Sequence, residues 1–236
     1  MHFALLLAVL AAPADVPPPP PPPPAAEAVP PTTAAAAVTA EPTPTPKGAV
    51  VLLKTSMGDI KLELDHEKAP ISTANFLRYV REKHYDGTIF HRVIRDFMIQ
   101  GGGMNISMMD KPTHAGIKNE SGNGLSNVRG SIAMARVDDP NSATSQFFIN
   151  HKDNLRLDSA RYAVFGKVVE GMEVVDKIAV VSTHTTREGY RDVPRTPVTL
   201  ERATVLFDPK AASEPAKPAA KKPADKPAPK AAEPAK

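Results

Sequence analysis

The sequence FHRVIRDFMIQGGG occupies residues 90–103 and carries more structural information than any other stretch of the chain. The apolar residues here form two short runs, at residues 89–94 and 97–100, which predict two strands. Three consecutive glycines can indicate a phosphate-binding loop, but no Lys-Ser or Lys-Thr pair follows Gly103 and no βαβ pattern surrounds it. We therefore expect residues 101–103 to permit close packing of the backbone at a strand end.

Further short apolar runs lie on both sides of this stretch. Residues 50–54 and 59–65 predict a hairpin with one buried face, because Ile60, Leu62 and Leu64 alternate with charged residues. The remaining predicted strands lie at residues 131–136, 146–150, 163–168 and 198–207.

Two helices are expected among these strands. Residues 69–84 have Pro70 near their start and Ser72 or Thr73 as a candidate N-cap, and residues 172–180 place apolar side chains on one stripe. Many short strands with only two helices indicate a mainly all-β fold. The periodicity is compatible with either an antiparallel barrel or a sandwich.

Proline and large apolar residues are separated along the chain. Of the 26 prolines, 14 precede Gly48 and seven lie from Pro209 onward, whereas 11 of the 12 aromatic residues lie between those two positions. Segments without large side chains cannot bury enough surface to offset the entropy of ordering them. The sequence therefore predicts one folded domain at residues 48–207, between a disordered Pro/Ala-rich linker at residues 15–47 and a disordered Lys/Pro/Ala-rich tail at residues 208–236.

The net charge of +3 is distributed unevenly. Residues 1–47 sum to −2, residues 48–209 to +1 and residues 210–236 to +4, so the basic character lies in the tail. A nearly neutral domain argues against nucleic-acid binding, which needs clustered cations. Contact between the cationic tail and an anionic envelope surface is a hypothesis. The absence of cysteine excludes disulfides, thiolate zinc sites and cysteine nucleophiles.

Residues 1–14 are predicted to form a signal peptide. Residues 3–12 form an apolar run of about the length of a signal-peptide core, and Ala12-Pro13-Ala14 supplies small residues where cleavage is expected. The run is too short to cross a bilayer as a helix. We therefore expect a periplasmic or secreted protein, with membrane contact only through an uncleaved N-terminus. The alternative is an Ala/Leu-rich start without a targeting role.

Several segments together resemble one known family. These segments are FHRVIRDFMIQGGG at residues 90–103, GSIAMAR at residues 130–136, SQFFIN at residues 145–150 and YAVFGKVVEG at residues 162–171. In their order and spacing they are similar to the signature stretches of cyclophilin-type peptidyl-prolyl cis-trans isomerases. The resemblance covers residues 48–207. It is closest to the bacterial periplasmic branch at two loops, DDPNSATSQ at residues 138–146 and KNE at residues 118–120.

This resemblance implies a closed eight-stranded antiparallel β-barrel capped by two α-helices, with the active site on the outer face. It implies catalytic roles for Arg92, Phe97 and Gln100, and Arg92 corresponds to the essential arginine of the family. The resemblance also implies substrate-binding roles for Met98, Ala135, Arg136, Gln146, Phe148, Leu157 and Tyr162. The apolar members would hold the proline ring, the glutamines would contact the peptide backbone, and residues 135–136 would hold the residues that precede the proline.

The chemistry of proline isomerisation agrees with these residue types. Rotation about an X-Pro bond crosses a barrier of about 18–20 kcal/mol without making or breaking covalent bonds, so no nucleophile or general base is required. In the twisted state the prolyl nitrogen recovers its lone pair, to which the guanidinium of Arg92 can donate a hydrogen bond. An apolar pocket fixes the ring and strengthens that contact. We expect no metal and no cofactor, and His91 is assigned a structural role inside the barrel.

The chain departs from the family pattern at three places. Arg156 stands where many cyclophilins have a tryptophan that contributes to cyclosporin binding, so we expect weak sensitivity to that drug with activity retained. Tyr162 stands in the place of a histidine at the pocket rim. The methionine-rich residues 104–113 have no clear counterpart and are assigned adaptable packing.

The sequence therefore predicts a monomeric isomerase that accelerates slow, proline-limited folding of envelope or secreted proteins, with proline-containing polypeptides as its partners. One alternative is a proline-peptide-binding chaperone module with little turnover. Another is an adaptor in which the two arms do the biological work and the barrel is a docking platform. The joint presence of Arg92, Phe97, Gln100 and Phe148 favours the enzyme.

Overall fold

The computed structural model of the chain describes residues 47–210. The predicted signal peptide, residues 15–46 of the predicted linker and residues 211–236 of the predicted tail lie outside the described residues. Within residues 47–210, no helix has both the length and the apolar composition needed to span a bilayer.

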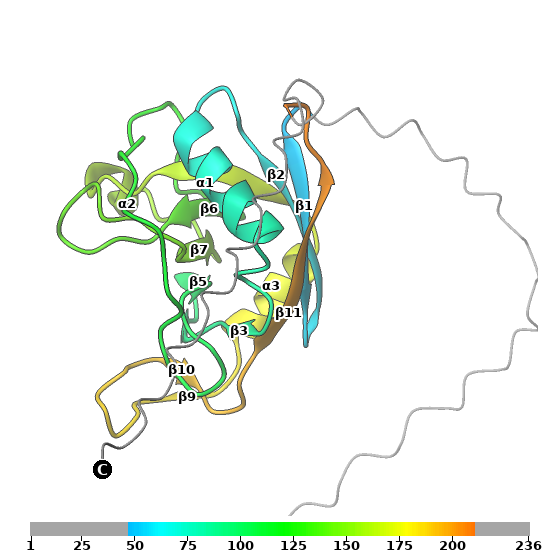
Figure 1. The fold of residues 1–236 in the computed structure, drawn as a ribbon. Coiled ribbons are helices and arrows are strands. Elements are labelled where there is room, and N and C mark those ends of the chain that lie inside the picture. Colours follow the sequence, from blue (N-terminus) through cyan, green and yellow to red (C-terminus); the bar gives the residue numbers. More distant parts are fainter. Residues whose placement is uncertain (1–46, 211–236) are drawn as a thin grey trace, which may run out of the picture. The chain divides into compact units, whose positions relative to one another are not determined.

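Most of the strands within residues 47–210 belong to one curled antiparallel sheet (Figure 1). The strands are hydrogen-bonded in the order β3-β11-β1-β2-β8-β6-β7-β5-β4. Their bounds are β1 Ala49–Thr55, β2 Gly58–Leu64, β3 Thr88–Ile89, β4 Arg92–Ile94, β5 Met98–Gly101, β6 Ser131–Met134, β7 Phe147–Asn150, β8 Val164–Glu170 and β11 Thr199–Phe207. A separate small ribbon pairs β9 (Thr183–His184) with β10 (Val193–Pro194).

The two end strands of this sheet, β3 and β4, are consecutive in the chain. β3 pairs with β11 and β4 pairs with β5, and only Phe90 and His91 separate them. Residues 88–94 therefore join the two edges of the sheet and close it into a barrel. The predicted strand at residues 89–94 is divided in two, so the sheet has nine strands. Counted as one strand, residues 88–94 complete the eight-stranded ring that the family resemblance implied.

The part of the chain that the structure describes contains three helices, α1 (Pro70–Arg81), α2 (Arg156–Ser159) and α3 (Met172–Ala179). α1 and α3 are the two predicted helices, and Figure 1 shows them between the β1–β2–β11 part and the β5–β6–β7 part of the sheet. Their apolar side chains join the inward-facing residues of the strands in one core. The short α2 was not predicted, because a single turn leaves too little periodicity to detect.

Aromatic rings fill the centre of the barrel. The ring of Phe76 on α1 lies 4.9 Å from that of Tyr85, 5.4 Å from that of Phe147 and 5.3 Å from that of Phe165, measured between centroids. All four side chains are fully buried. Phe147 points inward while Phe148 belongs to a second apolar cluster, as the alternation of side chains on a strand requires.

The start of α1 is capped by a residue from outside the helix. The carboxylate of Glu120 accepts hydrogen bonds from the backbone N–H groups of Ile71 at 2.9 Å and Ser72 at 2.7 Å, and from the hydroxyl of Ser72 at 2.6 Å. The prediction that Ser72 or Thr73 caps the helix was wrong, because the helix begins at Pro70 and both residues lie inside it. The negative charge that complements the positive end of the helix dipole comes instead from a distant loop.

The glycines at the end of β5 permit close packing, as expected from their sequence. Gly102 has a φ of +84°, and a Cβ atom there would lie 2.8 Å from the ring of Tyr85. A Cβ atom on Gly103 would lie 2.5 Å from the side chain of Gln146. Larger residues would therefore clash at both positions.

Ordered structure continues for a few residues beyond β11. The carboxylate of Asp208 is paired with His66 at 3.2 Å and also with Arg81 on α1. Burial opposes the charged form of Asp208, but hydrogen bonds from the Lys210 backbone and from Arg81 outweigh it and hold the pKa of Asp208 below its usual value. These contacts attach the end of β11 to α1.

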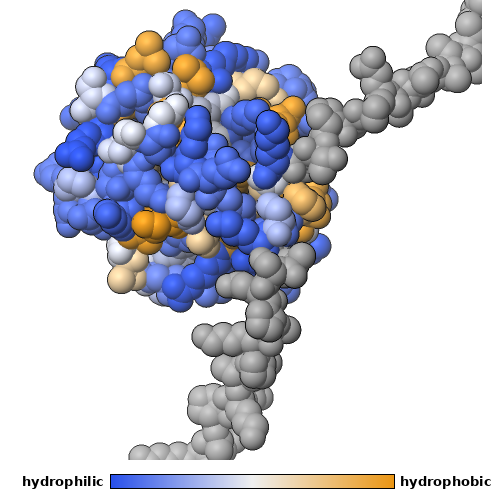
Figure 2. Space-filling model, turned by 90° about the horizontal axis from the view of Figure 1, so that it is seen from above, coloured by the Kyte–Doolittle hydropathy of each residue, from blue (hydrophilic) through white to orange (hydrophobic). Residues whose placement is uncertain are grey.

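The surface carries scattered apolar side chains rather than one continuous patch on the face seen in Figure 2, where hydrophobic residues are surrounded by hydrophilic ones. Among the large apolar residues, Val137 is 72% exposed and Ile106 is 61% exposed. Single exposed apolar residues of this kind are ordinary on folded proteins.

Replacing Glu120 by alanine is expected to lower the free energy of unfolding by about 1 kcal/mol, within a range of about 0.5–2 kcal/mol, because α1 loses its only carboxylate cap among the described residues. Urea denaturation followed by circular dichroism measures this change. Lys118→Ala, an exposed change in the same loop, is the control and should cost much less. Equal stability of Glu120→Ala and the unaltered chain would contradict the capping role.

Candidate active site

A row of side chains crosses the outer face of the barrel on β4, β5, β7 and β6. In the strand register Arg92 lies opposite Gln100, Gln100 lies opposite Phe148, and Phe148 lies opposite Ala133. Residues directly opposite each other on neighbouring strands place their side chains on the same face. The neighbouring residues Ile99 and Ile149 point into the barrel core. Four separate strands thus bring a cation, an amide, an aromatic ring and a methyl group into one row.

An apolar cluster that is separate from the barrel core surrounds this row. The buried members of the cluster are Met98, Ala133, Phe148 and Val164, and its partly buried members are Ile94, Phe97, Leu125, Ala135, Leu157 and Tyr162. The structure therefore brings the predicted site residues Phe97, Met98, Phe148 and Leu157 together, with Ala135 and Tyr162 beside them. The rings of Phe148 and Tyr162 meet edge to face, with 5.7 Å between centroids.

The two predicted glutamines lie next to each other at the edge of this cluster. Nε2 of Gln100 donates a hydrogen bond to Oε1 of Gln146 at 2.9 Å. Gln146 is further confined by its close contact with Gly103. Each amide keeps further hydrogen-bonding groups, since a primary amide has two N–H bonds and a carbonyl oxygen. The pair can therefore bind the polar backbone of an extended peptide.

Arg92 is held at the end of the row by a residue that the sequence analysis missed. Its Nε atom lies 3.7 Å from a carboxylate oxygen of Asp192, and 43% of its side chain is exposed. The backbone N–H of Val93 also donates to the carbonyl of Asp192 at 2.8 Å. Asp192 has a φ of +60° at the end of a loop, and no sequence motif marked it. The guanidinium is thus oriented and still accessible to a ligand.

Arg136 contacts both an aromatic ring and backbone carbonyls. Its guanidinium carbon lies 4.8 Å from the centroid of the Tyr162 ring. Its Nη atoms donate to the carbonyls of Val137, at 2.7 Å, and Ala160. The side chain therefore joins its own loop to the end of α2 and supports the Tyr162 ring from one side.

Three buried asparagines beneath the apolar cluster were also missed by the sequence analysis. Nδ2 of Asn154 donates to the carbonyl of Phe97 at 2.8 Å and to Oδ1 of Asn150 at 2.7 Å. Nδ2 of Asn150 donates to Oδ1 of Asn127 at 3.1 Å, and Asn127 donates to Asp158 on α2 at 2.7 Å. The network ties the turn that carries Phe97 to the helix that carries Leu157. Satisfied buried networks of this kind hold their members in one arrangement.

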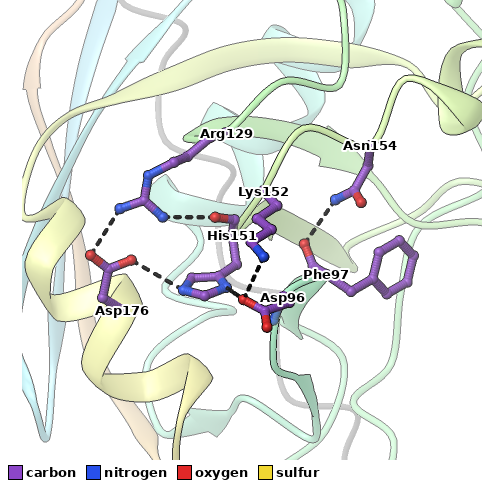
Figure 3. A network of polar contacts seen from close by, with 7 residues as sticks. All are labelled: Asp96, Phe97, Arg129, His151, Lys152, Asn154 and Asp176. Atoms are coloured by element: carbon purple, nitrogen blue, oxygen red, sulfur yellow. Dashed lines mark hydrogen bonds and ion pairs between the residues drawn. The ribbon is translucent and has the colours of Figure 1, made fainter.

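A charged network holds the same turn against α3 (Figure 3). The ring of His151 accepts a hydrogen bond from the backbone N–H of Asp96 at 3.1 Å and lies 3.2 Å from Asp176 on α3. Arg129 donates to Asp176 at 2.8 Å, which lowers the pKa of the Asp176 carboxyl group. Lys152 lies 3.1 Å from Asp96 and lowers the pKa of that carboxyl group. Both carboxylates therefore stay charged near neutral pH.

His91 is buried next to the site. Only 7% of the residue is exposed, and burial lowers the pKa of its ring despite a hydrogen bond with Gln146. Its Nδ1 atom has no hydrogen-bond partner among the described residues. Within residues 47–210, no group of three or more histidine or acidic side chains is arranged to hold a metal ion.

Comparison with known proteins identifies relatives of this domain. The family model "Cyclophilin type peptidyl-prolyl cis-trans isomerase/CLD" matches residues 50–205. A peptidyl-prolyl cis-trans isomerase of Acinetobacter baylyi is 56% identical over 155 residues, which are 64% of this chain and 82% of that protein. Peptidyl-prolyl cis-trans isomerase A of Dickeya dadantii is 52% identical over 66% of this chain and 84% of its own length. Peptidyl-prolyl cis-trans isomerase B of Escherichia coli is 49% identical over 66% of this chain and 99% of its own length.

A solved structure is also similar. The cyclophilin-type peptidyl-prolyl cis-trans isomerase of Cryptosporidium parvum, crystallised in the presence of the dipeptide Ala-Pro, superposes with a TM-score of 0.58 at 27% sequence identity. The similarity covers 67% of this chain and 99% of that one.

The free energy of unfolding is expected to fall as the pH is lowered from about 7.5 to 5. Burial lowers the pKa of His91 below its ordinary value of 6.5, so the folded state keeps the ring neutral while the unfolded chain binds a proton. This stabilisation is complete above about pH 6.5 and is lost as the pH falls toward the lowered pKa. Urea unfolding at several pH values measures it.

A His91→Asn variant provides the control for this pH dependence. Its stability should decline less steeply over the same pH range, because the titrating ring is gone. Burial also lowers the pKa of His84, so His84→Asn should reduce the slope as well. Slopes equal to that of the unaltered chain in both variants would contradict the assignment.

Proposed function

The chain belongs to the cyclophilin-type peptidyl-prolyl cis-trans isomerases and is an enzyme of that class, and we propose that it catalyses X-Pro rotation on the outer face of the barrel between Arg92 and the apolar cluster. The observation that carries this assignment is the register row, in which Arg92, Gln100 and Phe148 share one face of β4, β5 and β7. Arg92, Phe97 and Gln100 are the proposed catalytic residues.

In this mechanism the proline ring enters the apolar cluster, where it contacts Phe97, Met98, Phe148 and Leu157. Held there, the ring stays fixed while the carbonyl of the preceding residue swings about the C–N bond. The prolyl nitrogen loses amide resonance in the twisted state and becomes a hydrogen-bond acceptor. An N–H group of Arg92 donates to it, and this bond is absent in both planar isomers. The interaction therefore lowers the barrier rather than only binding the substrate.

The remaining residues hold the peptide on either side of the ring. Gln100 and Gln146 bind its backbone through the free groups of their paired amides. Ala135 lies beside Gln146, to whose carbonyl its N–H donates at 3.0 Å, and is proposed to receive the residues that precede the proline. Arg136 contributes by supporting Tyr162 at the pocket rim, so we assign it a positioning role.

The proposed clients are envelope or secreted proteins whose folding waits for proline isomerisation. Uncatalysed isomerisation takes tens to hundreds of seconds at 25 °C, which is slow enough to limit folding. The support for an extracytoplasmic location is the apolar run at residues 3–12 with small residues after it. Fractionation of cells that express the full chain tests this location directly.

Arg92→Ala is expected to reduce kcat/KM by roughly a hundredfold to a thousandfold, corresponding to about 2.7–4 kcal/mol of lost transition-state stabilisation. Arg92→Lys keeps the charge but not the planar fork of donors, so it should retain only part of the activity. Exchange NMR on an Ala-Pro peptide measures both rates, and unchanged circular dichroism shows that the fold is intact.

Arg202→Ala, an exposed arginine on β11, is the matched control and should leave the rate unchanged. If the unaltered chain and Arg92→Ala both gave the uncatalysed rate, the enzyme assignment would fail in favour of a proline-peptide-binding module. If both catalysed equally, the role of Arg92 would be wrong.

Cyclosporin is expected to inhibit this isomerase only weakly, because Arg156 occupies the position at which many relatives present a tryptophan. The guanidinium of Arg156 lies over the ring of Phe97, where a flat apolar surface for the drug would otherwise be available. A titration of isomerase activity with cyclosporin measures this. Inhibition as strong as that of a tryptophan-containing cyclophilin, assayed in parallel, would contradict the expectation.

A further inference from the structure

Arg156 is held at the rim of the apolar cluster by an aromatic ring. It is the first residue of α2, and its guanidinium carbon lies 4.8 Å from the centroid of the Phe97 ring. A cation–π contact with a ring uses no hydrogen-bond acceptor, so it leaves the N–H groups of the guanidinium available to a ligand. A cation is therefore fixed beside the place where the proline ring is proposed to bind.

This cation has no acidic partner within residues 47–210, since its side chain forms no ion pair or hydrogen bond there. The nearby basic residues differ in this respect, because Lys152 is paired with Asp96 and Arg129 is paired with Asp176. Asp158, two residues after Arg156, accepts hydrogen bonds from Asn127 instead. The charge of Arg156 is thus available to a ligand.

The strand register places Arg156 at one end of the proposed peptide-binding face. β7 runs from Phe147, next to Gln146 and the proposed subsite at Ala135, to Asn150, which lies opposite Met98 at the start of β5. Phe97 immediately precedes Met98, so the Phe97–Arg156 pair lies at the opposite end from Ala135. With the proline ring on Phe148 between them, residues that follow the proline extend toward Arg156.

We propose that Arg156 is a specificity-determining residue that favours clients with aspartate or glutamate shortly after the proline. This inference rests on the proposed function, because it takes the apolar cluster as the proline pocket. An acidic side chain there meets a cation that is already oriented and unpaired. A basic side chain at the same position is repelled by the guanidinium of Arg156. The preference is modest, because the site is exposed to solvent.

The test compares peptides that differ only after the proline, with the sequence Ala-Pro followed by Asp, Asn or Lys. With the full chain, kcat/KM should be about twofold to fivefold higher for the Asp peptide than for the Asn peptide, and lower for the Lys peptide. Arg156→Gln should remove the difference between Asp and Lys, and Arg156→Glu should reverse it. Arg156→Lys keeps the charge and should retain the order. Salt at about 1 M, where the Debye length is about 3 Å, should suppress the preference.

Two controls separate this inference from its premise. Arg202→Gln removes an equal charge from β11 and should leave the order of the three peptides unchanged. The Asn peptide reports catalysis without any charge effect. If the unaltered chain does not accelerate isomerisation of this peptide, the proposed function itself is overturned. Normal turnover of the Asn peptide, with the same Asp-to-Lys ratio in the unaltered chain and in Arg156→Gln, overturns the role of Arg156 alone.

Discussion

The antiparallel pairing of β5 with β7 is the constraint on which both the core and the site depend. It sets Ile99 opposite Ile149 on the inner face and Gln100 opposite Phe148 on the outer face. A shift of this register by one residue would turn the pocket residues into the barrel and expose the core residues. Because the inner face must bury its apolar side chains, the same force that folds the barrel also positions the outer row.

Phe97 is the point at which the supporting networks of the site meet. Its carbonyl accepts hydrogen bonds from Asn154 and from the backbone N–H of His151. Its ring contacts the guanidinium of Arg156. The preceding residue, Asp96, donates its backbone N–H to His151, which in turn contacts α3. A proline pocket that catalyses torsion has to stay still while the substrate turns. These contacts hold Phe97 from several directions and provide that rigidity.

Arg136 and Arg156 show how neighbours decide the role of a side chain. Each guanidinium carbon lies 4.8 Å from an aromatic centroid of the apolar cluster. Both Nη atoms of Arg136 also donate to backbone carbonyls, those of Val137 and Ala160, so these groups are used inside the protein. Arg156 has no such acceptors among the described residues, and its N–H groups remain available. Two similar aromatic contacts therefore leave different numbers of N–H groups available to a ligand.

The sequence by itself determined the mainly β fold class and nearly all of the strands, because alternation encodes which side chains share a face. Its resemblance to a known family marked Phe97, Met98, Phe148 and Leu157 of the apolar cluster, whereas Ile94, Leu125, Ala133 and Val164 were found only in the structure. Only the tertiary structure showed that Glu120 caps α1, that Asp192 holds Arg92, and that Asn127, Asn150 and Asn154 support the pocket. These residues act across separations of tens of positions, up to a hundred from Arg92 to Asp192, so no local pattern marks them. Folding decides which polar side chains become neighbours, so their pairing cannot be read from local sequence. The periodicity of apolar residues, in contrast, already predicts which side chains are buried.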